Sequence, residues 1–260
     1  MDRKNSLGKI SSLVFVSCTY LFLYVPIIVL LVFSFNVDRF PAPWTQFTLK
    51  WYHELFQDIY LWQAFGNSLI IASSATLISL AAGVGLIFYA AQGGKIGKTL
   101  GMFYGNLIVP ETVLAVSLLS FFTMIKVPLG LITLILAHSV LGLGFVVPIV
   151  YARYRELDPT LTEASLDLGA STLQTFFKVT LPLLRPTLTM SALLVFILSF
   201  DDFILSYFCA GSTAQTLSLY ILSMIRTGVS PVVNALSSVL LFLSSLLVLF
   251  FFSLKTRIRF

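Results

Sequence analysis

Long runs of hydrophobic residues, separated by short polar stretches, dominate the chain from end to end. About 20 apolar residues in a helix are enough to cross the roughly 30 Å of hydrocarbon in a bilayer. Because backbone polar groups in lipid must bond to one another, runs of this length predict helices and not isolated strands. We therefore predict an all-α, polytopic membrane protein with six transmembrane helices: Leu13–Phe35, Gly66–Ala91, Leu100–Ile125, Gly130–Tyr151, Thr187–Ala210 and Asn234–Leu254.

The lysine and arginine residues between these spans fall mainly on one side of the predicted membrane. That side holds both chain ends, the short turn at 92–99 and the long connection at 153–186. Positively charged loops stay in the cytoplasm, so we expect both termini to be cytoplasmic. On the other side, the segment 36–65 carries several Trp and Tyr residues and predicts a partly helical stretch lying on the outer leaflet. The segments 126–129 and 211–233 are the other predicted outer loops.

Composition agrees with lipid as the surrounding solvent. Charged residues make up 10% of the 260 residues, whereas soluble domains carry about 25%. The net charge of +5 reflects topology and predicts no nucleic-acid partner. Cys18 and Cys209 lie in apolar runs and cannot form a disulfide framework, and we predict neither a metal site nor a cofactor. No repeat or linker divides the sequence, which predicts one transmembrane domain over residues 1–260.

One stretch superficially suggests nucleotide chemistry. Gly97-Lys98-Thr99 resembles the end of a phosphate-binding loop, but Gln92 occupies the place of the first glycine and no strand precedes it. Gly83-x-Gly85 and Gly142-x-Gly144 lie in predicted spans, where small residues usually allow close helix contact. His138 is interpreted as a hydrogen-bonding helix residue. We therefore expect a non-catalytic chain that does not hydrolyse ATP.

The connection at 153–186 contains local signals for a first short helix. Asp158 followed by Pro159 is a favourable start, because Asp accepts free backbone N–H groups and proline suits the first turn. Helix-forming residues follow as far as Leu168. Gly169 then fits the left-handed conformation that ends many helices.

A second short helix is predicted directly after this glycine. Ser171 and Gln174 form a capping box, in which each side chain bonds the backbone of the other residue. We expect this helix to run to about Thr180 and to stop near Leu181-Pro182, because proline lacks the N–H that a helix interior needs. Two short helices meeting at a glycine make a compact element, which we call the elbow.

The elbow resembles the EAA loop of ABC importer permeases, the inner-membrane components of binding-protein-dependent transport systems. The family pattern is Glu-Ala-Ala, then Gly, then Leu-Pro, and this chain has Glu163-Ala164-Ser165, Gly169 and Leu181-Pro182. Ser165 replaces the second alanine, a small change that is compatible with docking. The likeness extends over most of the chain and is strongest to spermidine/putrescine permeases, through Tyr24-x-Pro26-Ile27-Ile28, Ser199-x-Asp201-Asp202 and Gly228-Val229-Ser230-Pro231-x-x-Asn234-Ala235.

This resemblance implies a type I ABC importer permease fold in a bacterial inner membrane. It also implies a cytoplasmic ABC ATPase dimer, a second and distinct permease subunit, and an extracytoplasmic substrate-binding protein as partners. The elbow would carry the motion of the ATPases to the spans. The docking residues implied by the motif are Glu163, Ala164, Ser165, Asp167, Leu168, Gly169 and Ala170. An ordinary surface helical hairpin is the alternative interpretation.

Three acidic residues fall inside the predicted spans: Glu111, Asp201 and Asp202. A charge near the bilayer centre costs about 2.5–3.5 kcal/mol on insertion scales, so such groups usually face protein or water. In a continuous helix Ser199, Asp202 and Ser206 would form one polar stripe, which favours Asp202 for a substrate path. Asp201 is assigned to an interhelical partner or to the rim of the entrance.

Carboxylates in a pore attract cations, and a flexible polyamine would also be attracted to aromatic faces. Glu111 follows Pro110, which can loosen the helix and admit a second carboxylate to the path. The alternative is that the acids pair with polar groups on neighbouring helices, and for Glu111 and Asp201 the two interpretations are evenly balanced. The predicted path residues are Asp202, Asp201, Glu111, Ser199, Ser206 and Tyr207.

The predicted function is ATP-driven import of spermidine or putrescine by alternating access. The same machine could carry another small substrate, such as ferric iron or thiamine. A secondary transporter that needs no ATPase and a purely structural membrane protein are alternatives from other classes. The direction of transport is implied by the resemblance alone.

Overall fold

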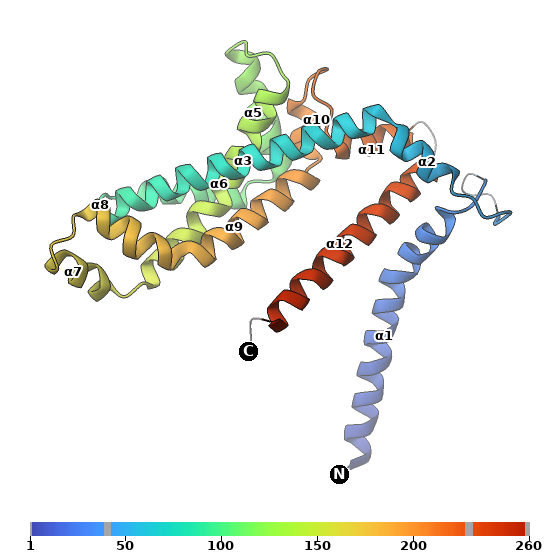
Figure 1. The fold of residues 1–260 in the computed structure, drawn as a ribbon, viewed down its shortest axis with the longest axis horizontal. Helices are drawn as coiled ribbons and strands as arrows, with labels where there is room; N and C mark the ends of the chain where they lie inside the picture. Colours follow the sequence, from blue (N-terminus) through green and yellow to red (C-terminus); the bar gives the residue numbers. More distant parts are fainter. Residues whose placement is uncertain (1, 39–42, 227–230, 258–260) are drawn as a thin grey trace. The chain divides into compact units, whose positions relative to one another are not determined.

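Helices make up almost all of the described chain (Figure 1). The computed structural model describes residues 2–38, 43–226 and 231–257, and the side chains of residues 12–38, 43–226 and 231–246. Over these residues, β-structure is limited to one isolated bridge between Asn36 and Phe47. The prediction of an all-α membrane protein is confirmed.

The chain divides into two compact units, of which the first is Met1–Ile59 with Ile221–Phe260. It contains α1 (Asp2–Phe33), α2 (Lys50–Gln57) and α12 (Pro231–Arg257), and α12 packs against both α1 and α2. The Ser34 and Tyr52 hydroxyls lie 2.7 Å apart and tie α2 to the end of α1. The helical part predicted within 36–65 is therefore present. The single domain predicted over residues 1–260 stays a prediction.

The second unit, Tyr60–Tyr220, is a helical bundle arranged around α6. Helix α6 packs against α9, α4 and α10, and the Ser79 hydroxyl of α3 donates a 3.0 Å hydrogen bond to the Ser139 carbonyl of α6. Figure 1 shows α3, α6 and α9 running alongside one another, with α7 and α8 at one end. The elements are α3 (Ile59–Ala91), α4 (Gly97–Ile108), α5 (Glu111–Met124), α6 (Leu131–Glu156), α7 (Pro159–Asp167), α8 (Thr172–Thr175), the π-helix η1 (Phe176–Thr180), α9 (Leu181–Asp201), α10 (Ile204–Cys209) and the start of α11 (Leu217–Arg226).

Glycines allow the close helix crossings of this bundle. A Cβ atom on Gly142 would collide with the Ser79 hydroxyl and lie 2.7 Å from Val195 Cγ1. A Cβ atom on Gly83 would lie 2.6 Å from Val146 Cγ1. The predicted role of these small residues in helix contact is confirmed at both positions. Two buried apolar clusters complete the packing, one including Ile71, Leu134 and Leu205 and the other Ile87, Val150 and Phe176.

The predicted span Leu100–Ile125 is wrong as a single helix. The structure has two helices here, α4 and α5, bent by 113° around Val109-Pro110. Proline donates no backbone hydrogen bond and disfavours helical backbone in the residue before it, which explains the break. Four described helices are long and apolar enough to cross a membrane, and the bent pair makes up to five. With α12 as a further crossing, these helices are compatible with six spans.

The predicted helix end at Leu181-Pro182 is also wrong. Helices α8, η1 and α9 continue as one span, Thr172–Asp201. In η1 the N–H of Leu181 bonds to the carbonyl of Phe176, five residues back. This wider turn allows the helix to continue through Pro182, which has no N–H to donate.

The predicted end of this span at Ala210 is wrong as well. The helix ends at Asp201, because Asp202 takes an extended conformation with ψ 131° before α10 begins. The predicted outer loop at 211–233 contains α11 and is therefore partly helical.

Candidate functional site

The two broken helices of the second unit meet at one cavity of about 580 Å³. Residues at the α4–α5 break and at the α9–α10 break both line it, and α6 supplies Leu141 and Phe145. The lining contains the three predicted acids and no basic residue among those the structure describes. The full lining is Asn106, Leu107, Val109, Glu111, Leu114, Leu141, Phe145, Ile197, Leu198, Asp201, Asp202, Phe203 and Ile204.

Two of the acids occupy the beginnings of helices. Glu111 is the first residue of α5, and the Asp202 carboxylate accepts the backbone N–H groups of Leu205 at 3.4 Å and Ser206 at 2.9 Å in α10. The positive end of a helix dipole favours a carboxylate at this position. Half-helices that begin at mid-membrane are a common way to build a transport site.

Glu111 and Asp202 line the same cavity. Two carboxylates that share a site repel each other when both are ionised. A cation bound in the cavity would be attracted by both groups and would reduce their repulsion. The arrangement is therefore suited to binding positive charge.

Asp201 and Asp202 have different surroundings although they are adjacent. Asp201 is exposed and its side chain is available in the cavity, whereas Asp202 is only 7% exposed. The carboxylate of Asp202 is engaged with the α10 backbone, and its carbonyl oxygen accepts a 2.7 Å bond from the Ser218 hydroxyl. Asp201 is thus the acid with more freedom to contact a solute.

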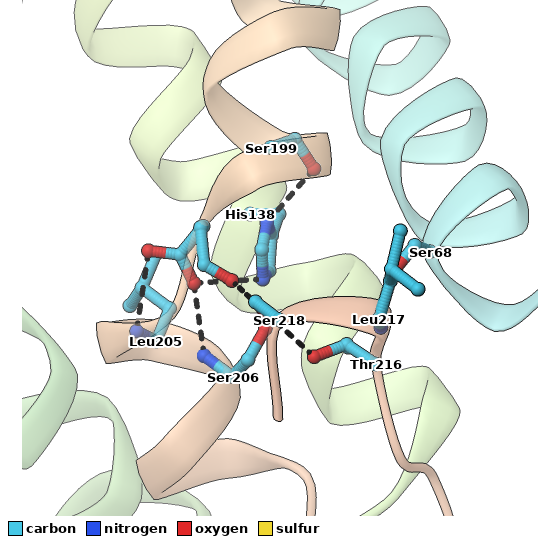
Figure 2. A network of polar contacts seen from close by, with 9 residues as sticks. Ser68, His138, Ser199, Leu205, Ser206, Thr216, Leu217 and Ser218 are labelled. Atoms are coloured by element: carbon cyan, nitrogen blue, oxygen red, sulfur yellow. Dashed lines mark hydrogen bonds and ion pairs between the residues drawn. The ribbon is translucent and has the colours of Figure 1, made fainter. Parts of the chain in front are cut away.

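A buried histidine, His138, lies beside Asp202. Figure 2 shows it next to Ser199 within a network of polar contacts. Nδ1 of His138 is 2.8 Å from the Ser199 hydroxyl, and Nε2 is 3.5 Å from an oxygen of Asp202. The network continues from Ser218 to Thr216, and the hydroxyls of these two residues lie 3.0 Å apart. Between them, the N–H of Leu217 donates to the hydroxyl of Ser68 in α3. The prediction that His138 is a hydrogen-bonding helix residue is confirmed.

The structure does not bring every predicted path residue to the cavity wall. Ser199 and Ser206 are buried and do not belong to the lining. Tyr207 packs against the rings of Phe203 and Phe208 and is likewise outside the lining. The predicted continuous polar stripe through Ser199 and Ser206 is wrong, because the helix breaks between them at Asp202. A contact of these three residues with substrate stays a prediction.

The first half of the elbow has the predicted local structure. The Asp158 carboxylate accepts the N–H of Thr160 at 3.0 Å, and hydrogen bonds from this threonine lower the pKa of Asp158 below its ordinary value of 3.8. Gly169 adopts φ +86°, the left-handed conformation expected of it. The N–H groups of Gly169 and Ala170 bond to the carbonyls of Leu166 and Ser165 at 2.9 and 3.1 Å, which is a Schellman ending.

The second half of the elbow is fastened to the first. Ser171 and Gln174 form the predicted capping box, with bonds of 3.0 and 3.3 Å. The Ser165 hydroxyl lies 2.9 Å from the hydroxyl of Thr175, so the residue that departs from the family's second alanine joins α7 to α8. Leu168, at the bend, is 89% exposed. Of the other docking residues implied by the motif, Glu163, Ala164 and Asp167 have exposed side chains, whereas Ser165 and Ala170 are partly buried.

Among the side chains of residues 12–38, 43–226 and 231–246, no three His, Cys, Asp or Glu groups gather in a way that could hold a metal ion.

Comparison with known proteins places this arrangement in a family. Residues 4–259 match the binding-protein-dependent transport system inner membrane component. The chain belongs to this family. The permease is 40% identical over 239 residues to the spermidine/putrescine transport system permease protein PotC of Escherichia coli K12, a match that covers 90% of each chain. It is also 34% identical over 232 residues to the E. coli K12 putrescine transport system permease protein PotI, covering 85% of this chain and 82% of that one.

A solved structure supports the same fold. The permease superposes on a chain of a bacterial ABC transporter involved in the import of the acidic polysaccharide alginate, with a TM-score of 0.73. The match covers 98% of the permease and 97% of that chain at 17% identity, so it concerns the fold alone. The expected ABC importer permease fold is therefore confirmed, and the protein is an inner-membrane transport component.

Sequence reasoning missed how residues distant in the chain complete the site. Asn106 lines the cavity and donates a 2.9 Å bond to the Val140 carbonyl, which holds α4 to α6. Ser218 secures the backbone of the α9–α10 break. Neither residue lies in a local motif. A polar side chain in a predicted span, such as Asn106, was the one available signal.

Proposed function

We propose that this permease is part of an ATP-driven importer of polyamines such as spermidine and putrescine. The observation that carries the proposal is the cavity between two broken helices, lined by Glu111, Asp201 and Asp202 and by no described basic residue. The names of relatives that are 34–40% identical support the same class of cargo.

The cavity matches the chemistry of a polyamine. Such a molecule is a flexible chain in which methylene groups separate protonated amines. Its amines would be attracted by the carboxylates, and its methylene groups would lie on apolar walls such as Leu141 and Ile197. Phe145 and Phe203 also line the cavity and offer aromatic faces that attract ammonium groups.

The proposed importer contains further subunits. A second, distinct permease would enclose the path together with this one, and an extracytoplasmic binding protein would deliver the polyamine. With both termini cytoplasmic, the elbow faces a cytoplasmic ATPase dimer. The exposed Leu168 at its bend supports docking of the ATPases onto the elbow, because an isolated surface hairpin gains nothing from exposing a large apolar side chain to water. Glu163 and Asp167 are also exposed and would flank the contact.

The helical span from the elbow to the cavity supports a mechanical connection. Thr172–Asp201 is continuous, so its first residue belongs to the elbow and its last residue lines the cavity. At about 1.5 Å per residue this span is roughly 45 Å long. We infer that closure of the ATPases on nucleotide binding displaces the elbow, and that the span transmits this displacement to the acids by alternating access.

The test is polyamine uptake into proteoliposomes that contain both permeases, the ATPases and the binding protein. Asp201→Asn and Glu111→Gln should each raise the KM for spermidine about 10- to 100-fold, because a hydrogen bond to a charged group is worth about 1.5–3 kcal/mol. The matched control is Glu54→Gln, which removes an exposed carboxylate that pairs with Lys50 outside the cavity. It should leave KM unchanged.

Three outcomes would refute the proposal. Unchanged spermidine KM in both cavity variants would remove the role of the acids. Accumulation of ferric iron or thiamine without polyamine uptake would assign another cargo. Uptake by the permease alone, driven by an ion gradient without ATP, would make it a secondary transporter.

A further inference from the structure

The α9–α10 break gives two adjacent aspartates opposite surroundings. Asp201 is the last residue of α9 and is exposed in the cavity. Asp202 is nearly buried, and its carboxylate caps α10. A small rotation of the backbone at this break would exchange the two side chains, because neighbouring residues point in different directions. Something must therefore hold the break in one conformation.

His138 is placed to do this from a different helix. It is fully buried in the first third of α6 and lies close to both sides of the break. On one side it bonds Ser199, in the last turn of α9, at 2.8 Å. On the other side its Nε2 atom lies 3.5 Å from the Asp202 carboxylate. Figure 2 shows the imidazole between Ser199 and the turn that leads to Ser206.

The hydrogen-bonding capacities of these groups define how the histidine is used. An ionised carboxylate only accepts hydrogen bonds, so the nitrogen that faces Asp202 favourably is one that carries hydrogen. In a neutral imidazole Nδ1 is then the acceptor, and the Ser199 hydroxyl donates to it. Nε2 is buried without a hydrogen-bond partner of ordinary geometry, and a carboxylate oxygen of Asp202 lies 3.5 Å from it.

The other contacts of the break restrain its backbone but do not choose between the two acids. Ser218 holds the carbonyl oxygen of Asp202, and the α10 N–H groups bind a carboxylate. His138 alone joins the last turn of α9 to the carboxylate itself. We propose that His138 is a positioning residue, which keeps Asp202 on the α10 backbone and thereby leaves Asp201 facing the cavity as the acid that meets the polycation.

This role rests on the proposed function, because the orientation of Asp201 matters for transport only if the cavity takes a cation. The alternative is that His138 merely fills space in the core. The two differ in what a substitution should do. A space-filling residue can be replaced by an apolar side chain of similar size, whereas a positioning residue requires a polar group at Nε2.

The experiment measures the orientation of position 201 while Asp202 is kept intact. Asp201→Cys and the reference variant Leu198→Cys are made separately in an assembled transporter whose Cys18 and Cys209 have been replaced by Ser and Ala. Both positions line the cavity, so the ratio of their rates of modification by a cationic methanethiosulfonate reagent corrects for access of the reagent to the cavity. With His138 present, we expect the thiol at position 201 to react faster, since Asp201 is exposed and Leu198 is partly buried.

Three variants of His138 distinguish the interpretations. His138→Leu and His138→Asn remove the group at Nε2 and should reduce the ratio of the two rates about tenfold. His138→Gln extends a polar amide towards Asp202 and should restore most of the ratio. If His138→Leu prevents assembly, the Asn and Gln pair still decides, because both are polar. A ratio that is the same in the Asn and Gln variants as with histidine would overturn the proposal.

A second measurement separates this result from the cargo. Spermidine should protect the thiol of Asp201→Cys from the reagent in the nucleotide-free transporter. Loss of the rate ratio in His138→Asn without any spermidine protection would uphold the positioning role and refute polyamine as the cargo. Protection by spermidine together with an unchanged rate ratio in His138→Asn would support polyamine as the cargo and refute the positioning role of His138. In the chain that retains Asp201, His138→Asn should raise the spermidine KM and leave kcat nearly unchanged, and His138→Gln should restore KM.

Discussion

Gly169 offers a direct test of the elbow, because its backbone conformation is unusual and its surroundings are empty. It has φ +86°, and no heavy atom outside its own neighbours lies within 4 Å of the place where a Cβ atom would stand. A new side chain would therefore meet no collision. Any effect of a small substitution must come from the backbone conformation itself.

The magnitude follows from this conformation. A residue with a Cβ atom in the left-handed region costs about 1–2 kcal/mol, and a β-branched residue such as valine is at the upper end. Asparagine tolerates this region much better. Gly169→Val should thus shift the turn about 5- to 30-fold towards other conformations, and Gly169→Asn should shift it far less.

The assay has one local and one functional measurement. Locally, the amide hydrogen of Ala170, which bonds to the carbonyl of Ser165 in the intact turn, should exchange about 5- to 30-fold faster in Gly169→Val. Functionally, spermidine taken up per ATP hydrolysed should fall in Gly169→Val and stay near the unsubstituted value in Gly169→Asn.

Two results would refute the reasoning. Equal exchange at Ala170 in the Val and Asn variants would show that left-handed strain does not control the turn. Faster exchange with undiminished uptake per ATP in Gly169→Val would show that the turn does not couple the ATPases to the spans.

Three further predictions concern packing, capping and pH. Gly142→Leu should lower the stability of the detergent-solubilised permease by about 1–3 kcal/mol, because the new side chain meets Ser79 and Val195. The control Gly85→Ala places its methyl group where nothing lies within 4 Å and should not lower the unfolding temperature in the same thermal scan, because alanine favours a helix more than glycine does. Ser171→Ala should destabilise the second half of the elbow by about 1 kcal/mol through the lost cap, seen as faster amide exchange at Gln174, whereas the adjacent Thr172→Ala should not accelerate it. Hydrogen bonds hold the pKa of Asp158 below 3.8, so its cap is complete at pH values above 3.8 and is lost as the pH falls through the lower pKa of the folded state. Protection of the Thr160 amide, corrected for intrinsic exchange, should therefore fall at acid pH in the unsubstituted chain but not in Asp158→Asn. Equal acid sensitivity of the two proteins would contradict this.

The elbow could be predicted almost residue by residue because its structure is local. Asp158, Gly169 and Ser171 each act on backbone groups within a few positions, so their chemistry is visible in the sequence. The prediction was wrong only at Leu181-Pro182, where a proline was expected to end the helix. The π-helical turn that accommodates it depends on packing, since Phe176 is buried in the core next to Phe88.

The cavity could be predicted only in part. The rarity of acids in apolar runs was sufficient to select Glu111, Asp201 and Asp202, and Pro110 marked one of the two breaks. The second break has no proline or glycine. It depends on His138 and Ser218, which lie 64 and 16 positions from Asp202 along the chain. Because the stripe of Ser199 and Ser206 assumed an unbroken helix, the sequence could not tell which aspartate would be free.

The π-helical turn at Phe176–Thr180 has an evolutionary consequence. Its hydrogen bond spans five residues where that of an ordinary helix spans four, so the turn holds one extra residue. Each residue in a helix turns the chain by about 100°, so loss of this residue would rotate everything beyond it, Asp201 included. Deletion of a single codon would therefore change which side chain faces the cavity while α7 kept its local structure.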